Sequence, residues 1–112
     1  MAEYKTPDFD KQREDRVKFI LDISTQAPAG RKILDECLDI AELLIKKNTS
    51  YGSSYSHPIN IFSKSDPKEQ LYIRIDDKLN RIKKGSEYAS EDTLLELIGY
   101  LVLLRTLKWA MN

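Results

Sequence analysis

The chain has 112 residues, the size of one domain, and 41% of them are hydrophobic, which is enough for a modest core. Its 18 basic and 18 acidic residues cancel, which excludes a general attraction to nucleic acid or to an anionic membrane, so we expect no sequence-specific DNA binding. The single cysteine excludes an internal disulfide and fits a reducing cytoplasm, and the charged N-terminus and short apolar runs predict neither a secretory signal nor a membrane span.

Residues 1–8 are expected to form a loose N-terminal arm of a single domain spanning residues 1–112. A first helix is predicted from Phe9 to about Ile23, and it ends because proline and glycine lie close together in STQAPAG. A second helix is predicted from about Ala29 to Lys47. Its apolar residues recur at the spacing of one helical face, and they are Leu34, Cys37, Leu38, Ala41, Leu44 and Ile45. On that face the Cys37 thiol is expected to act as a small hydrophobic group.

The third predicted helix has the clearest start and stop signals. Asp66 is in the N-cap position, Pro67 occupies the first turn, and Glu69 completes the spacing of a capping box. Two lysines and Gly85 mark its end, where cations and a glycine are favoured. One apolar stripe runs along this helix, formed by Leu71, Ile75, Leu79 and Ile82.

A fourth helix is predicted to start after Ser90 and to run towards Trp109, and its apolar residues cover most of its circumference. A helix of this kind is buried on most sides. No segment alternates apolar and polar residues as a strand does, so the sequence predicts an all-α fold, a four-helix bundle with a long Ser/Tyr-rich loop between its second and third helices. One small bundle has too few helices to cover the fourth, which predicts a homo-oligomer, a dimer or tetramer.

Two acidic residues stand out on the fourth helix. Asp92 and Glu96 lie four residues apart on a narrow stripe of an otherwise apolar helix. Asp92 has a simple explanation, because acids are favoured in the first turn. Glu96 is a turn further in, and a buried carboxylate needs a cation, a metal ion or several hydrogen-bond donors. Both residues are candidate metal ligands, and pairing of Glu96 with a lysine or arginine is the alternative.

Basic residues on the third helix could supply that cation. Arg74, Lys78 and Arg81 follow one another at helical spacing beside the apolar stripe, with Asp77 among them. They form either a solvated face with local ion pairs or a ridge that grips phosphate oxygens. No nucleophile with a matching base is visible, so no catalytic residue is assigned.

The segment 46–67, KKNTSYGSSYSHPINIFSKSDP, separates the second and third helices. Long loops in compact domains are usually functional or disordered. Tyr51 and Tyr55 offer aromatic faces that stack on bases at about 1–3 kcal/mol each, and hydroxyls such as that of Ser53 can donate to phosphate. His57, the only histidine, is either a further contact or a surface residue. The loop, ordered near residues 48–66 alone or by ligand, is predicted to cover a nucleotide.

The motifs YGSSY, YIRIDDKLNRI and EDTLLELIGYLVLL resemble, in order and spacing, the nucleotide modification associated domain family of small helical phage proteins. The resemblance covers roughly residues 40–105. It implies a link to nucleotide chemistry and a cytoplasmic location, the host cytoplasm for a phage protein. It also points to a set of site residues, namely Tyr51, Gly52, Arg74, Asp77, Lys78, Arg81, Asp92 and Glu96.

The chain is also similar in outline to the MazG-type all-α nucleoside triphosphate pyrophosphatases, which hold magnesium with acidic residues of two helices. The ECLD segment has their Glu-x-x-Asp spacing, but on the outward side of the second helix, and Asp92 and Glu96 are four residues apart, not three. Three hypotheses follow. The first is a non-catalytic binder of nucleotides or cyclic nucleotides that sequesters an immune signal or handles modified nucleotides, with no cofactor. The others are a magnesium-dependent pyrophosphatase and a helical interaction module without a ligand.

Overall fold

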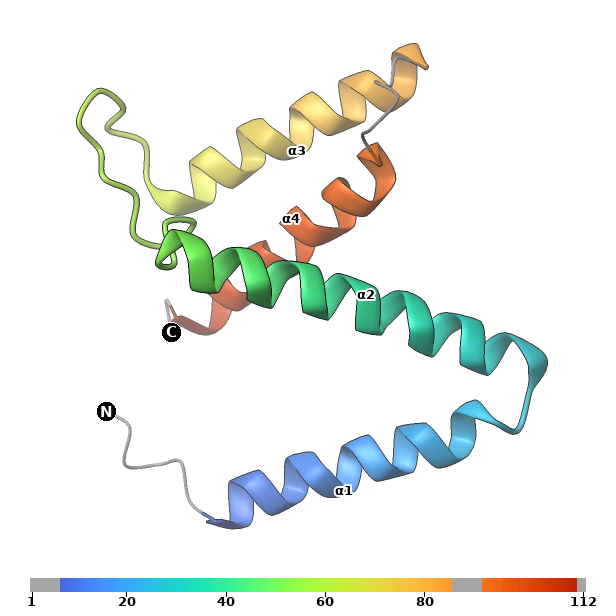
Figure 1. Cartoon of the computed structure of the whole chain (residues 1–112). Helices are drawn as coiled ribbons and strands as arrows, with labels where there is room; N and C mark the ends of the chain where they lie inside the picture. Colours follow the sequence, from blue (N-terminus) through green and yellow to red (C-terminus); the bar gives the residue numbers. More distant parts are fainter. Residues whose placement is uncertain (1–6, 86–91, 111–112) are drawn as a thin grey trace. The chain divides into compact units, whose positions relative to one another are not determined.

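The computed structural model describes residues 7–85 and 92–110, and in these ranges it consists of four helices without a strand (Figure 1). They are α1 (Pro7–Ser24), α2 (Pro28–Tyr51), α3 (Pro67–Lys84) and α4 (Thr93–Ala110). The predicted all-α fold is confirmed, with the long loop between α2 and α3. Most of the predicted arm lies outside the described residues, but Pro7 and Asp8 already belong to α1. No helix in the described part of the chain has the length and apolar character needed to cross a membrane.

Contacts divide the chain into two units, Met1–Asp39 and Ile40–Asn112, and the boundary falls inside α2. The first unit holds α1 and the start of α2. At the turn between them, Ser24 is buried and its hydroxyl donates to the carbonyl of Leu21 at 2.8 Å. A Cβ on Gly30 would lie 2.5 Å from the Ser24 carbonyl oxygen, so this close approach requires glycine.

In the second unit α3 and α4 pack against each other (Figure 1). The buried apolar residues of the described chain all lie in this pair, and they are Leu71, Ile75 and Leu107. The loop and the C-terminal half of α2 complete a small helical bundle. Its core is thin, because only three apolar side chains among the described residues are buried.

The predicted ends of α3 are confirmed. The Asp66 carboxylate accepts a hydrogen bond from the backbone N–H of Glu69 at 2.8 Å, Pro67 is the first helical residue, and Gly85 has the left-handed φ of 69° that favours glycine. On α4 the cap differs from the expected arrangement. Asp92, expected inside the first turn, precedes the helix and accepts from the N–H of Leu95 at 2.9 Å. Ser90 and Glu91 lie outside the described residues.

Helix α2 is longer than predicted. It continues four residues beyond Lys47, to Tyr51, and ends where Gly52 and Ser53 adopt φ values of 62° and 60°. Their N–H groups both donate to the carbonyl of Asn48. The segment KNTSY contains no proline or glycine, so nothing in it stops a helix before Gly52. Part of the predicted loop is therefore helix.

The predicted apolar stripes are only partly buried. On α3, Leu71 and Ile75 are buried, but Leu79 and Ile82 are 49% and 46% exposed, and Lys78 takes the next buried position. On α2, all of which is described, no residue is buried and Cys37 is exposed. Helix α4 was predicted to be buried on most sides, but it is not. Among residues 93–107, three large apolar side chains remain exposed: Leu94, Leu101 and Val102.

Candidate ligand-binding pocket

The second unit contains a cavity of about 150 Å³ between the C-terminal half of α2, the following loop, α3 and α4. Its lining combines leucines with tyrosines and a few charged or amide groups. The lining residues are Leu43, Leu44, Lys47, Asn48, Tyr51, Ser54, Tyr55, Arg74, Leu95, Glu96, Gly99, Tyr100 and Leu103. Such a mixture of apolar walls and a few converging polar groups is typical of a small-molecule site.

Helical spacing explains how α2 and α4 supply most of this lining. On α2, the residues at positions 44, 47, 48 and 51 follow the i, i+3, i+4 and i+7 pattern of one face. On α4, positions 96, 99, 100 and 103 repeat the same pattern. Gly99 brings the two faces together, because even a methyl group there would lie 3.2 Å from Cδ2 of Leu44.

A hydrogen bond holds the loop against α4. The hydroxyl oxygens of Tyr55 and Thr106 are 2.8 Å apart. Thr106 donates its only hydroxyl proton to the carbonyl of Leu103 at 2.6 Å, so Tyr55 is the donor and Thr106 the acceptor. The bond places the Tyr55 ring in the wall of the pocket.

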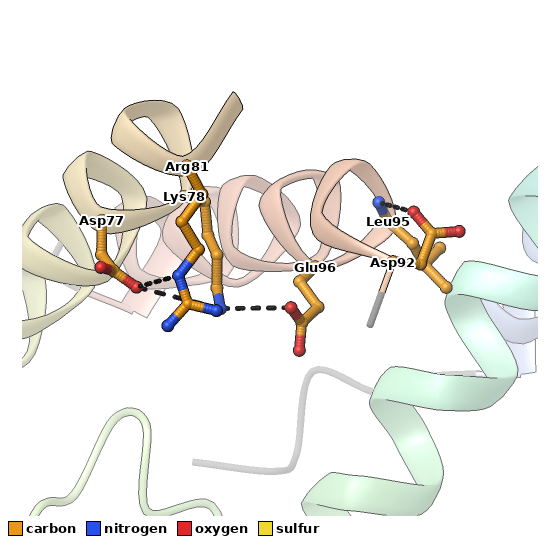
Figure 2. Close-up of polar contacts among 6 residues, drawn as sticks. All are labelled: Asp77, Lys78, Arg81, Asp92, Leu95 and Glu96. Atoms are coloured by element: carbon orange, nitrogen blue, oxygen red, sulfur yellow. Dashed lines mark hydrogen bonds and ion pairs between the residues drawn. The ribbon is translucent and has the colours of Figure 1, made fainter. Parts of the chain in front are cut away.

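An ion pair links α3 to the pocket (Figure 2). The Lys78 ammonium lies 3.1 Å from Oε1 of Glu96, and the two side chains are 10% and 29% exposed. Asp77 is 4.0 Å from Lys78 and 3.4 Å from the guanidinium of Arg81, so four charges form one chain. The alternative in which Glu96 pairs with a cation of α3 is the one that the structure shows.

Two buried oxygens in the lining have no hydrogen-bond donor among the described residues. One is Oδ1 of Asn48 and the other is Oε1 of Glu96. Lys78 neutralises the charge of Glu96 from 3.1 Å, and because a carboxylate oxygen has two lone pairs, Oε1 can accept from a further donor. Buried acceptors without donors are uncommon in folded proteins.

The exposed cations of the pocket are Lys47 and Arg74. The Arg74 guanidinium lies 5.9 Å from the centre of the Tyr100 ring, a cation–π distance that holds the arginine beside the cavity. Because both cations are exposed and both belong to the lining, they stand at its rim. The rim is therefore positive, while the interior offers acceptor oxygens.

Four of the site residues predicted from the sequence lie together in the lining of the pocket: Tyr51, Tyr55, Arg74 and Glu96. The remaining predicted residues lie elsewhere in the described chain. Gly52 and Ser53 form the end of α2, and the exposed His57 has Nδ1 2.9 Å from the Ser56 hydroxyl. Lys78 and Arg81 belong to the ion-pair chain, so the three basic residues of α3 do not form a continuous exposed ridge.

Sequence reasoning missed four leucines and Gly99 of the lining, and also four residues with polar groups, namely Lys47, Asn48, Ser54 and Tyr100. A signal exists for three of them. Lys47 and Asn48 precede Tyr51 by four and three residues, and Tyr100 follows Glu96 by four, which is the spacing of neighbours on one helical face.

The residues do not fit a resident magnesium ion well. Within residues 7–85 and 92–110, no three histidine, cysteine, aspartate or glutamate side chains come together as a metal site. Asp92 caps α4 through one oxygen and Glu96 faces a lysine.

The chain was compared with protein-family models, with curated proteins and with solved structures. None of the three comparisons found a match.

Proposed function

We propose that the second unit binds a nucleotide or cyclic nucleotide without chemical turnover. The observation that carries this proposal is one pocket in which three tyrosines, two exposed cations and a buried acceptor pair converge. A nucleotide needs these partners: flat groups for its base, cations for its phosphate and hydrogen-bonding groups for the edge of its ring.

The size of the cavity indicates which part of a nucleotide it can hold. An engineered apolar cavity of about 150 Å³ in another protein accommodates one benzene molecule, and the cavity here has about the same volume. It therefore suits a single ring system rather than a whole nucleotide. In this proposal the base enters between α2 and α4, and the sugar and phosphate remain at the rim.

The charged residues of the rim support this orientation. Arg74 presents a planar fork of N–H donors, the geometry that grips two phosphate oxygens at once. Lys47 adds a second positive charge from α2. Tyr51, which is exposed at the end of α2, and Tyr55, which is fixed by Thr106, offer rings for stacking.

Binding without turnover is favoured because the two candidate metal ligands have other partners. Asp92 stabilises the start of α4, and the charge of Glu96 is balanced by Lys78. A binder of this kind fits the resemblance to the nucleotide modification associated domain family. Its role in a phage setting would be to sequester a nucleotide immune signal or to hand modified nucleotides to another protein.

The test is calorimetric binding of mono-, di- and cyclic nucleotides to the parent protein and to an Arg74→Ala variant. We expect Arg74→Ala to weaken binding by about 1.5–3 kcal/mol, the scale of a hydrogen bond to a charged group, and to reduce the salt dependence of the affinity. Arg105→Ala is the matched control, because Arg105 is exposed on α4 outside the lining, and it should bind as the parent does. A parent protein that binds no nucleotide refutes the proposal. Magnesium-dependent hydrolysis of nucleoside triphosphates that Glu96→Gln abolishes would establish the pyrophosphatase in its place.

A second candidate function is self-association through the apolar side chains that α4 leaves exposed. Leu94, Leu101 and Val102 are 60%, 45% and 40% exposed. Large apolar surface of this kind marks interfaces when it is contiguous. This function is compatible with nucleotide binding, and it predicts an assembly whether or not a ligand is present.

A further inference from the structure

We propose that the pocket selects bases that bear an exocyclic amino group, as adenine, cytosine and guanine do, over the same rings without it. This inference rests on the proposed function and adds the class of base to it. Its source is the pair of buried acceptor oxygens in the lining of the cavity, Asn48 Oδ1 on α2 and Glu96 Oε1 on α4.

Asn48 contributes the first acceptor. Its backbone carbonyl already accepts from the N–H groups of Gly52 and Ser53, which fixes the backbone at the end of α2. The side-chain oxygen is buried and has no donor in the described chain. An acceptor in this state has lost its water and gained no partner, so a ligand N–H gains most there.

Glu96 contributes the second acceptor. A carboxylate has about four lone-pair sites, and Lys78, 3.1 Å from Oε1, takes at most one of them, so the carboxylate can still accept from a ligand. Carboxylates accept from the amino group of cytosine in DNA grooves, and asparagine pairs with the amino edge of adenine. The two side chains are thus of the types that read amino-bearing rings.

Hydrogen-bond donors and acceptors lie in different parts of the pocket, which favours one orientation of a bound nucleotide. Lys47 and Arg74 at the rim are donors only, which suits phosphate oxygens, whereas the buried Asn48 and Glu96 oxygens are acceptors. A ring that presents a carbonyl to these oxygens would bring two acceptors together. A ring that presents an amino group satisfies them.

The experiment compares matched nucleotides on the unmodified protein by isothermal calorimetry. Three pairs differ only by the amino group: adenosine and purine riboside monophosphates, guanosine and inosine monophosphates, and cytidine and pyrimidin-2-one riboside monophosphates. For the base that binds best, we expect loss of the amino group to weaken binding about tenfold or more, since one buried acceptor loses its donor. Asn48→Leu should bring this ratio closer to one, because only the Glu96 acceptor remains, and Asn48→Asp, which keeps an acceptor, should preserve it.

Asn80→Leu is the control, because Asn80 is exposed on α3 outside the lining and its replacement should leave the ratio unchanged. Equal affinities within all three pairs overturn this inference and leave the proposed function standing. Loss of the preference in Asn48→Asp also overturns it, because the amide would then be acting as a donor. Failure of every nucleotide to bind overturns both. The comparison on the parent protein decides the matter even if the Asn48→Leu variant does not fold.

Discussion

Lys78 is an ionised side chain held almost entirely out of water. Its side chain is 10% exposed, and the Glu96 carboxylate at 3.1 Å and Asp77 at 4.0 Å are the anions beside it. Removing a charge from water is costly, and a buried pair returns that cost only when both partners remain. The two partners are unequal, because Glu96 lies at the pocket wall and keeps more contact with solvent.

This asymmetry predicts unequal effects of two substitutions. Glu96→Gln leaves a buried ammonium with only Asp77 nearby, and we expect the free energy of unfolding to fall by about 2–3 kcal/mol, below the loss for a fully buried pair. Lys78→Met removes the buried charge itself and should cost about 1 kcal/mol or less. Chemical denaturation of both single variants and the double variant measures the coupling.

The exposed Glu42–Lys46 pair on α2 provides the control. Glu42→Gln should change the free energy of unfolding by no more than about 0.5 kcal/mol. Equal losses in Glu96→Gln and Glu42→Gln would show that the Lys78 pair contributes no more than a surface ion pair.

At the scale of the helix, Gly99 sets how closely α4 approaches α2. In the interior of a helix, glycine costs roughly 0.5–1 kcal/mol relative to alanine, so its presence needs a compensating reason. The reason lies in the contact with Leu44, where an added Cβ would be only 3.2 Å from Cδ2. That atom is the end of a flexible side chain and can move by a few tenths of an ångström.

We therefore expect Gly99→Ala to leave the thermal midpoint unchanged or to raise it, because helix propensity outweighs the small shift of Leu44. The added methyl group also enters the pocket lining, so nucleotide affinity should fall about tenfold if the base occupies this cavity. Gly85→Ala should show the reverse pattern. Gly85 has a φ of 69° and open space around it, so alanine there strains the backbone of α3 and leaves the pocket intact. Equal affinity of Gly99→Ala and the parent would place the base elsewhere.

For the whole molecule, the main question is what covers the remaining apolar surface. Large apolar side chains are exposed on α4, and α1 carries five more: Val17, Phe19, Ile20, Leu21 and Ile23. We expect light scattering at micromolar concentration to report a dimer or tetramer. Leu101→Glu should shift the protein towards the monomer, since a buried charge at an interface is costly, whereas Lys83→Gln, at an exposed position of α3, should not. A parent protein that is monomeric at this concentration rules out the predicted homo-oligomer.

The sequence predicted the helices better than the pocket, and the reason is physical. Asp66, Pro67 and Gly85 act through bonds to their own neighbours, so they marked the ends of α3 correctly. Tyr51, Tyr55, Arg74 and Glu96, which line the pocket, are singled out in the sequence because their side-chain types are unusual where they occur.

The pocket residues that were missed depend on contacts between helices. Asn48 and Tyr100 enter the lining because α2 approaches α4 at Gly99. The approach of these two helices cannot be predicted from the sequence pattern of either helix alone. Lys78 follows Leu71 by seven residues and Ile75 by three, which is the spacing of their buried face. It was assigned to an exposed ridge because lysine is rarely buried without a partner, and the partner, Glu96, lies on another helix.

The exposure of Cys37 has a practical consequence for experiments on this protein. It is the only thiol in the chain and it lies on the surface of α2, two residues before the boundary between the two units. A maleimide dye or a spin label would therefore attach at one known position without disturbing a buried side chain. A second cysteine introduced at exposed Asn80 would add a reporter in the other unit, so that distances across the boundary become measurable with and without nucleotide.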